Sequence, residues 1–178
     1  MHDRKALLFV LLFLIPVILF SQSATPREFY EKGEALLSSG DVYRAIEQFK
    51  AAMSGNPDYL QPYLGMARAY YILESYNQSL NYARQAERLN EHSTERLLLE
   101  ARALTAIGNI QESEHVYNNI LEKEPNNQNA RLGMAEINLF KGRSEEALNQ
   151  YLDLLEYGTP SRRLLISLLI FSDISGQP

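Results

Sequence analysis

The sequence predicts an all-α solenoid of stacked helical hairpins. Aligning it with itself at a step of 34 residues gives a column of small residues, a second small column and a largely aromatic column: Gly33, Ala67, Ala101 and Ala135; Ala45, Ser79, Ser113 and Ala147; Phe49, Ala83, Tyr117 and Tyr151. A fixed period of this length is typical of stacked repeats, each of which buries its apolar face only against its neighbours. Function is therefore expected on a surface rather than in a buried pocket.

The residues in these columns carry a family pattern. The first repeat contributes Phe29, Gly33, Ala45, Phe49, Ala52 and Pro57, and the third contributes Leu97, Ala101, Leu104, Gly108, Tyr117 and Pro125. This pattern resembles the tetratricopeptide repeat, a helix-turn-helix unit. The resemblance extends from Pro26 to Ser161 without insertion. The sequence departs from the family at Arg131, where an aromatic residue is expected, and at Glu91, where a closing proline is expected.

The resemblance implies a right-handed superhelical solenoid of four repeats. They cover residues 26–59, 60–93, 94–127 and 128–161. Residues 162–176 are then a C-terminal capping helix or the first helix of a fifth repeat. Residues 162–174 are apolar nearly all round, which predicts burial on more than one side. The candidate oligomer or partner surface on this helix is Leu165, Leu168, Leu169 and Phe171.

Local signals mark where the helices begin and end. Thr25, Pro26 and Glu28 have the types of an N-cap, a first-turn proline and a capping-box glutamate. Thr159 and Pro160 repeat that start signal. Glycines occupy three positions where the chain must leave one helix and reverse into the next: Gly40, Gly108 and Gly142. Glycine tolerates the left-handed conformation that ends many helices.

Residues 1–23 are expected to be a cleaved secretory signal. Arg4 and Lys5 precede an apolar run of about 15 residues, from Ala6 to Phe20, which as a helix spans about 22 Å. That is shorter than the roughly 30 Å hydrocarbon core of a bilayer. Ser21 and Ser23 are small residues suited to a cleavage site before Ala24. The alternative is an uncleaved anchor.

The chain is therefore predicted to be exported, with the periplasm of a double-membrane bacterium as the expected compartment. If the N-terminal segment is retained, the protein is instead anchored to the inner membrane and faces the periplasm. The sequence contains no cysteine, which excludes lipid attachment at a cysteine after the signal. Membrane contact is expected only through the N-terminal segment, if it is uncleaved.

Composition and motifs favour a non-catalytic protein. The net charge of −5 argues against a nucleic-acid surface. His92 and His115 have no second histidine three or four residues away, which gives a metal site little support. Neither a glycine-rich phosphate loop nor a nucleophile elbow occurs in the sequence. We therefore predict no enzyme activity, no cofactor and no metal.

The resemblance implies that the first helices line a concave peptide-binding face. The candidate groove residues are Tyr30, Glu34, Leu64, Arg68, Tyr71, Leu98, Arg102, Leu132, Glu136 and Phe140. Within one helix the columns recur at i, i+4 and i+7, so they form one stripe. Arg68 and Arg102 can bind a carboxylate or a backbone carbonyl beside the leucines. Alternatively, the arginines pair with Glu34 and Glu136 or stay solvated, and the leucines pack within the stack.

One binding mode of the family is not expected. Repeats that hold the acidic C-terminus of cytosolic chaperones do so with lysine, arginine and asparagine side chains. The corresponding positions here are Tyr30, Glu34, Gly65, Glu95 and Leu99. The sequence therefore lacks this clamp.

The sequence favours a protein–protein interaction scaffold in the bacterial cell envelope. It predicts a peptide or protein partner of unknown identity in the concave groove, during assembly of a larger complex. The alternative is a structural component that oligomerises through the apolar C-terminal helix, with a membrane anchor if the signal is retained.

Overall fold

The computed structural model describes residues 24–90, 92–158 and 161–175. Four helical hairpins follow one another: α2 (Pro26–Ser38) with α3 (Val42–Gly55), α4 (Leu60–Ile72) with α5 (Tyr76–Gln85), α6 (Thr94–Ile107) with α7 (Ile110–Lys123), and α8 (Gln128–Phe140) with α9 (Ser144–Tyr157). A short 3-10 helix, η1 (Ala86–Arg88), follows α5, and α10 (Arg162–Ser175) follows the fourth hairpin. The described residues contain no strand. The segment 1–23 and the start signal at Thr159 and Pro160 lie outside the described residues.

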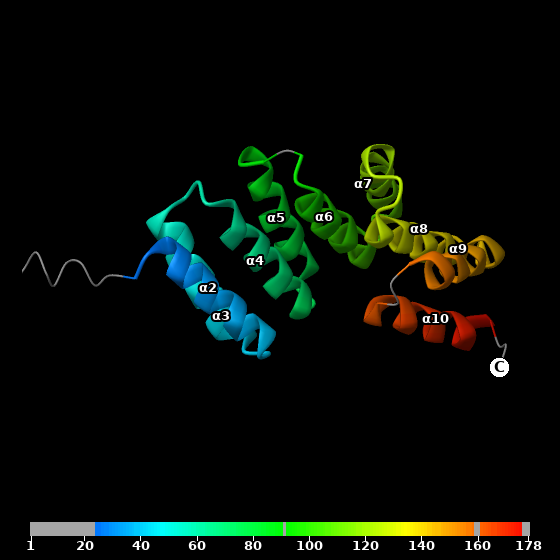
Figure 1. The fold of residues 1–178 in the computed structure, drawn as a ribbon, viewed down its shortest axis with the longest axis horizontal. Helices are drawn as coiled ribbons and strands as arrows, with labels where there is room; N and C mark the ends of the chain where they lie inside the picture. Colours follow the sequence, from blue (N-terminus) through cyan, green and yellow to red (C-terminus); the bar gives the residue numbers. More distant parts are fainter. Residues whose placement is uncertain (1–23, 91, 159–160, 176–178) are drawn as a thin grey trace, which may run out of the picture.

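The hairpins line up along the long axis of the molecule (Figure 1). Each first helix contacts the first helix of the next hairpin, from α2 through α4 and α6 to α8. Each second helix also packs on the first helix that follows it, and α10 continues this order against α8 and α9. The arrangement confirms the predicted all-α solenoid. Its core runs along the stack as a series of clusters rather than as one central globule.

The two small columns form the contact between the helices of each hairpin. Their alanine and serine members are completely buried. The Ser79 hydroxyl donates to the carbonyl oxygen of Ala67 at 2.8 Å, and the Ser113 hydroxyl donates to that of Ala101 at the same distance. These bonds satisfy the two buried hydroxyls, so the serines fit where the other repeats have alanine.

The aromatic column fills the space between successive repeats. Phe49 and Tyr117 are completely buried, and each faces a glycine of the next first helix. A Cβ atom on Gly65 would lie 2.7 Å from Cζ of Phe49, and one on Gly133 would lie 2.2 Å from Cζ of Tyr117. Real Cβ atoms do not approach a ring this closely, so no larger side chain fits here without movement of the helices.

Side-chain size alternates across these interfaces. In the second repeat the aromatic column holds only Ala83, and the residue in the position of Gly65 and Gly133 is Leu99, in the same buried cluster. In the fourth repeat the column holds Tyr151, and the corresponding residue of α10 is the small, buried Ser167. A large residue on one side is therefore matched by a small one on the other. This complementarity allows α10 to pack as the first helix of a fifth unit.

The helix ends follow the sequence signals. Thr25 forms the predicted capping box, because its hydroxyl accepts from the backbone N–H of Glu28 while the Glu28 carboxylate accepts from the N–H of Thr25. Gly40, Gly108 and Gly142 have φ values of +85°, +93° and +74°. Glu74 occupies the equivalent turn position in the second repeat, 34 residues after Gly40, and its φ is +56°. A residue with a Cβ atom is strained there by roughly 1–2 kcal/mol.

None of the helices in the described part of the chain combines the length and the apolar character that a membrane crossing requires.

Candidate functional site

Charged residues form a column along the first helices, one from each repeat: Glu34, Arg68, Arg102 and Glu136. Arg68 lies between two carboxylates, and its guanidinium donates to Glu34 at 2.5 Å and to Glu95 of α6. Burial acts to lower the pKa of Arg68, but the two carboxylates outweigh it and raise that pKa above its ordinary value. Arg68 therefore joins three consecutive first helices by ion pairs.

Glu136 holds α10 in place. Arg163 donates to it from Nε at 3.1 Å and from a second guanidinium nitrogen, which makes the pair bidentate. The Ser167 hydroxyl also donates to Glu136, at 2.8 Å. Burial acts to lower the pKa of Arg163, and Glu136 more than reverses this, so the guanidinium stays charged. Burial also raises the pKa of Tyr151 to about 12, so this neighbouring phenol stays neutral.

The two ion pairs obey one geometric rule. Arg68 to Glu95 and Glu136 to Arg163 each join residues 27 positions apart, in successive first helices, with the charges exchanged. At the same spacing from Arg102 the sequence has Asn129, which cannot form an ion pair. The carboxylate nearest in the column, Glu136, is already held by Arg163.

Arg102 is consequently the member of the column that has no ion pair or hydrogen bond within the described residues. Its guanidinium carbon lies 4.5 Å from the centre of the Tyr71 ring, a cation–π contact that fixes the group in place. Its Nε is buried and has no hydrogen-bond partner in the described part of the chain. The two terminal nitrogens of the guanidinium are not among the buried atoms, so they are the donors that a ligand with its own acceptor can reach.

Exposed apolar side chains lie at the ends of the helices on both sides of α6. Ile72 of α4 and Phe140 of α8 are 55% and 69% exposed, and they occupy the same column of the repeat. Since α6 contacts both α4 and α8, Arg102 lies between the helices that carry these two residues. We call Tyr71, Ile72, Arg102 and Phe140 the Arg102 face.

Two of the predicted groove leucines are not accessible. Leu64 and Leu132 are only 1% and 2% exposed, because they pack into the clusters between hairpins. A leucine at this position of a first helix is drawn into the stack when the hairpins approach closely. The prediction that they contact a ligand is therefore wrong. Leu98 is half-buried against the cluster of the third repeat.

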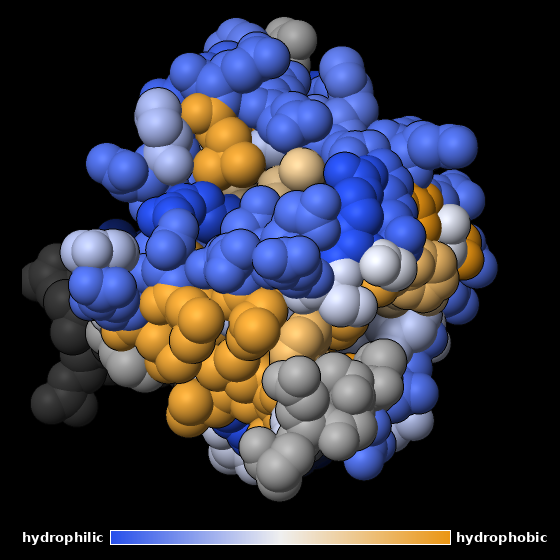
Figure 2. Space-filling model, turned by 90° about the vertical axis from the view of Figure 1, so that its right-hand side faces the viewer, coloured by the Kyte–Doolittle hydropathy of each residue, from blue (hydrophilic) through white to orange (hydrophobic). Residues whose placement is uncertain are grey.

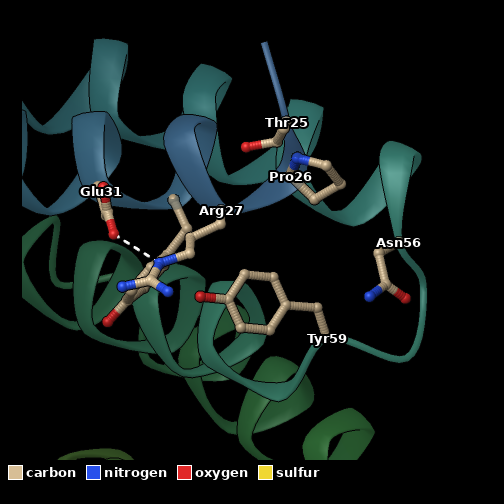
Figure 3. Close-up of a pocket in the computed structure, with 7 residues that line it drawn as sticks. Thr25, Pro26, Arg27, Glu31, Asn56 and Tyr59 are labelled. Carbon is tan, nitrogen blue, oxygen red and sulfur yellow. Dashed lines mark hydrogen bonds and ion pairs between the residues drawn. The ribbon is translucent and has the colours of Figure 1, made fainter.

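The predicted residue Tyr30 lies apart from Arg102, on the first hairpin. It lines a pocket of about 540 Å³ with Thr25, Pro26, Arg27, Glu31, Asn56 and Tyr59. Figure 3 shows Arg27 bonded to Glu31 beside the hydroxyl end of Tyr59, and the nitrogen–oxygen distance of this ion pair is 2.8 Å. The rings of Tyr30 and Tyr59 meet edge to face with centroids 5.5 Å apart. The charges of this pocket are already paired, unlike that of Arg102.

The predicted surface on α10 is only half exposed. Leu165 and Leu169 are 50% and 70% exposed, whereas Phe171 is 7% exposed and packs edge to face on Tyr151. Leu168 is half-buried in the same cluster. The assignment of Phe171 to a partner surface is therefore wrong, because its ring completes the packing of the fourth repeat. Figure 2 shows the exposed part as an orange patch on the lower half of this end of the molecule.

Sequence reasoning missed Glu95, Arg163 and Ser167 as partners of the charged column. The signal was present as opposite charges 27 residues apart, but only contact between successive first helices gives that spacing meaning. The described residues hold no cluster of three potential metal ligands.

Comparisons with known proteins support one family. Residues 98–162 match the family model described as tetratricopeptide repeat. No curated protein sequence matches the chain. The fold is similar to a tetratricopeptide repeat protein from Parabacteroides merdae ATCC 43184, with a TM-score of 0.78 and 16% identity over 99% of this chain and 69% of the other.

Two further structures have the same fold. A thermophilic tetratricopeptide repeat protein of Thermus thermophilus has a TM-score of 0.71 and 24% identity over 93% of this chain and 94% of its own. The first such domain of Spaghetti (RPAP3), bound to the HSP90 peptide SRMEEVD, has a TM-score of 0.63 and 24% identity over 66% of this chain and 94% of its own.

Proposed function

We propose, starting from the premise that the chain is a tetratricopeptide repeat protein, that it is a scaffold which binds a peptide or protein partner through the Arg102 face. The observation that carries this proposal is the half-buried guanidinium of Arg102, which has no acceptor within the described residues. The other charges of its column are used in ion pairs that join the helices.

The chemistry of the Arg102 face selects the ligand. A guanidinium held over an aromatic ring, with its carbon 4.5 Å from the ring centre, presents a fork of donors, and a carboxylate accepts two of them at once. Exposed Ile72 and Phe140 favour apolar side chains on the same ligand. The ligand is therefore a peptide that carries a carboxylate, either its C-terminus or an acidic side chain, next to apolar residues.

The ligand carries few carboxylates on this proposal. The domain of Spaghetti is described as bound to a peptide with two glutamates and an aspartate. In this chain the positions that correspond to the clamp residues of chaperone-binding repeats include Glu34 and Glu95. Both carboxylates are already paired with Arg68. These carboxylates repel an acidic run, and within the described residues they leave Arg102 as the unpaired cation of the charged column. A single anchored carboxylate fits that charge distribution.

Photo-crosslinking in cells tests this assignment. A photoreactive amino acid is placed at Phe140, which is exposed, rather than at Tyr71, which holds Arg102. We expect Arg102→Ala to reduce capture of the partner by roughly ten- to a hundredfold, the range for loss of hydrogen bonds to a charged group. Capture is measured by mass spectrometry of the crosslinked band.

Arg44→Ala is the matched control, because it removes the same charge from an exposed site on α3 whose ion pair is local. It should leave capture unchanged. If Arg102→Ala captures the partner as well as Arg44→Ala does, the Arg102 face is not the binding site. Arg68→Ala should loosen the stack instead, since both of its carboxylates lose their partner.

We further propose that this scaffold acts in the bacterial cell envelope, in the assembly of a larger complex. The support is the charged and then apolar N-terminal segment of residues 1–23. For the protein purified from an exporting host, the intact mass should correspond to a chain that begins at Ala24. A mass that includes residues 1–23 favours the alternative of an inner-membrane anchor facing the periplasm.

A second candidate function, oligomerisation through α10, is favoured by the exposed Leu165 and Leu169. Arg102→Ala should not affect it.

A further inference from the structure

The exposed side of α10 is a continuous face. Its members in the range 162–173 are Arg162, Leu165, Ile166, Leu169, Ile170 and Asp173, all exposed. At 3.6 residues per helical turn these positions fall within a sector of about 140°. The six remaining residues of that range are buried or half-buried against the fourth repeat. One side of α10 is therefore committed to the stack, and the other is apolar with a charge at each end.

A further hairpin helix does not fit this face well. In the four repeats, the second helix covers the first helix at the small column, where the residues are Gly33, Ala67, Ala101 and Ala135. The corresponding residue of α10 is Leu169, which is 70% exposed. A leucine there would keep a second helix from approaching as closely as it does in the repeats. The face instead suits the wider packing of a helix pair with interlocked leucine and isoleucine side chains.

The face is its own complement when a second copy is turned end for end. If a two-fold axis passes between residues 167 and 168, Leu165 of one copy faces Ile170 of the other, and Ile166 faces Leu169. The same operation places Arg162 against Asp173. Every exposed residue thus meets a partner of matching character, and the two terminal charges attract. In a parallel pair each charge would face its like.

We propose that α10 pairs antiparallel with α10 of a second copy of this chain, around a two-fold axis between residues 167 and 168. The observations that carry it are the exposed apolar face and the charge complementarity at its ends. A two-fold contact of this kind is closed, so it yields a dimer rather than a filament. The dimer does not depend on Arg102, and it joins two Arg102 faces in one particle, which allows bivalent capture of a repeated ligand.

Charge reversal tests the pairing on the full chain. Arg162→Asp and Asp173→Arg each replace two attractive contacts by two repulsive ones, because of the two-fold symmetry. We expect each single change to raise the dimer dissociation constant by about tenfold. The double variant Arg162→Asp/Asp173→Arg restores attraction and should return to the wild-type value. Sedimentation equilibrium measures all four proteins, and every one of them carries the same N-terminal segment.

Orientation is tested with single cysteines, since the sequence contains none of its own. A mixture of Ile166→Cys and Leu169→Cys chains should form the mixed disulfide in preference to either homodisulfide, because antiparallel packing brings these two positions together. The proposal is overturned if the wild-type chain stays monomeric at every concentration up to about millimolar, a range that covers weak specific contacts. It is equally overturned if the double charge variant is not restored, or if homodisulfides dominate.

Discussion

Replacing Gly133 with leucine is expected to lower the free energy of unfolding by about 3 kcal/mol, near the upper end of the usual range for overpacking. The reason is that a Cβ atom on Gly133 already meets the buried Tyr117 ring at 2.2 Å. The ring cannot move away, because it is enclosed by Leu97, Ile120 and the rest of its cluster. The third and fourth hairpins must therefore separate. Thermal unfolding followed by circular dichroism should show a midpoint roughly 6–12 °C lower.

Asn129→Leu is the control for this prediction. It adds a leucine to the same helix, α8, at an exposed position one turn earlier. Its effect should stay within about 0.5 kcal/mol, as for most surface substitutions. Equal midpoints for the Gly133 and Asn129 variants would show that the interface between the hairpins is looser than the packing of Tyr117 indicates.

Much of the fold could be predicted because repetition supplies long-range information. The 34-residue period in the sequence fixes which residues correspond, and correspondence between Ala67, Ala101 and Ala135 already implies similar surroundings for each. The buried small columns and the left-handed glycines follow from that alone. Glu74 did not stand out, because a strained backbone angle leaves no composition signal when the residue is not glycine.

The site could be predicted only in part, because exposure depends on how adjacent hairpins meet. Arg68 and Arg102 belong to one column and look equivalent in the sequence, yet Arg68 is paired twice whereas Arg102 is not. The difference comes from Glu95 and Asn129, which occupy equivalent positions on the next first helix. The sequence leaves open whether these two arginines form ion pairs with carboxylates of the stack. Within the described residues, Arg68 does so and Arg102 does not.

Size complementarity between hairpins leads to a prediction with a rescue. Phe49→Ala is expected to lower the free energy of unfolding by about 3–5 kcal/mol, because it removes a completely buried ring. Gly65→Leu alone should cost about 1–3 kcal/mol, since its side chain meets the Phe49 ring. Combining the two changes copies the natural pair of Ala83 and Leu99, in which the leucine occupies the space left by the small residue.

The double variant should therefore be more stable than the sum of its parts predicts, by about 1–3 kcal/mol, the usual range for residues in contact. Urea denaturation of the wild type, both single variants and the double variant measures this coupling. Adding Gly33→Ala to the double variant should recover more of the lost free energy of unfolding. Gly33 also borders the Phe49 ring, and it corresponds to Ala67 in the repeat that carries Ala83. Strict additivity of the Phe49 and Gly65 changes would mean that the leucine cannot enter the cavity. The order of large and small residues along the stack would then be set by each hairpin separately and not by the contact between them.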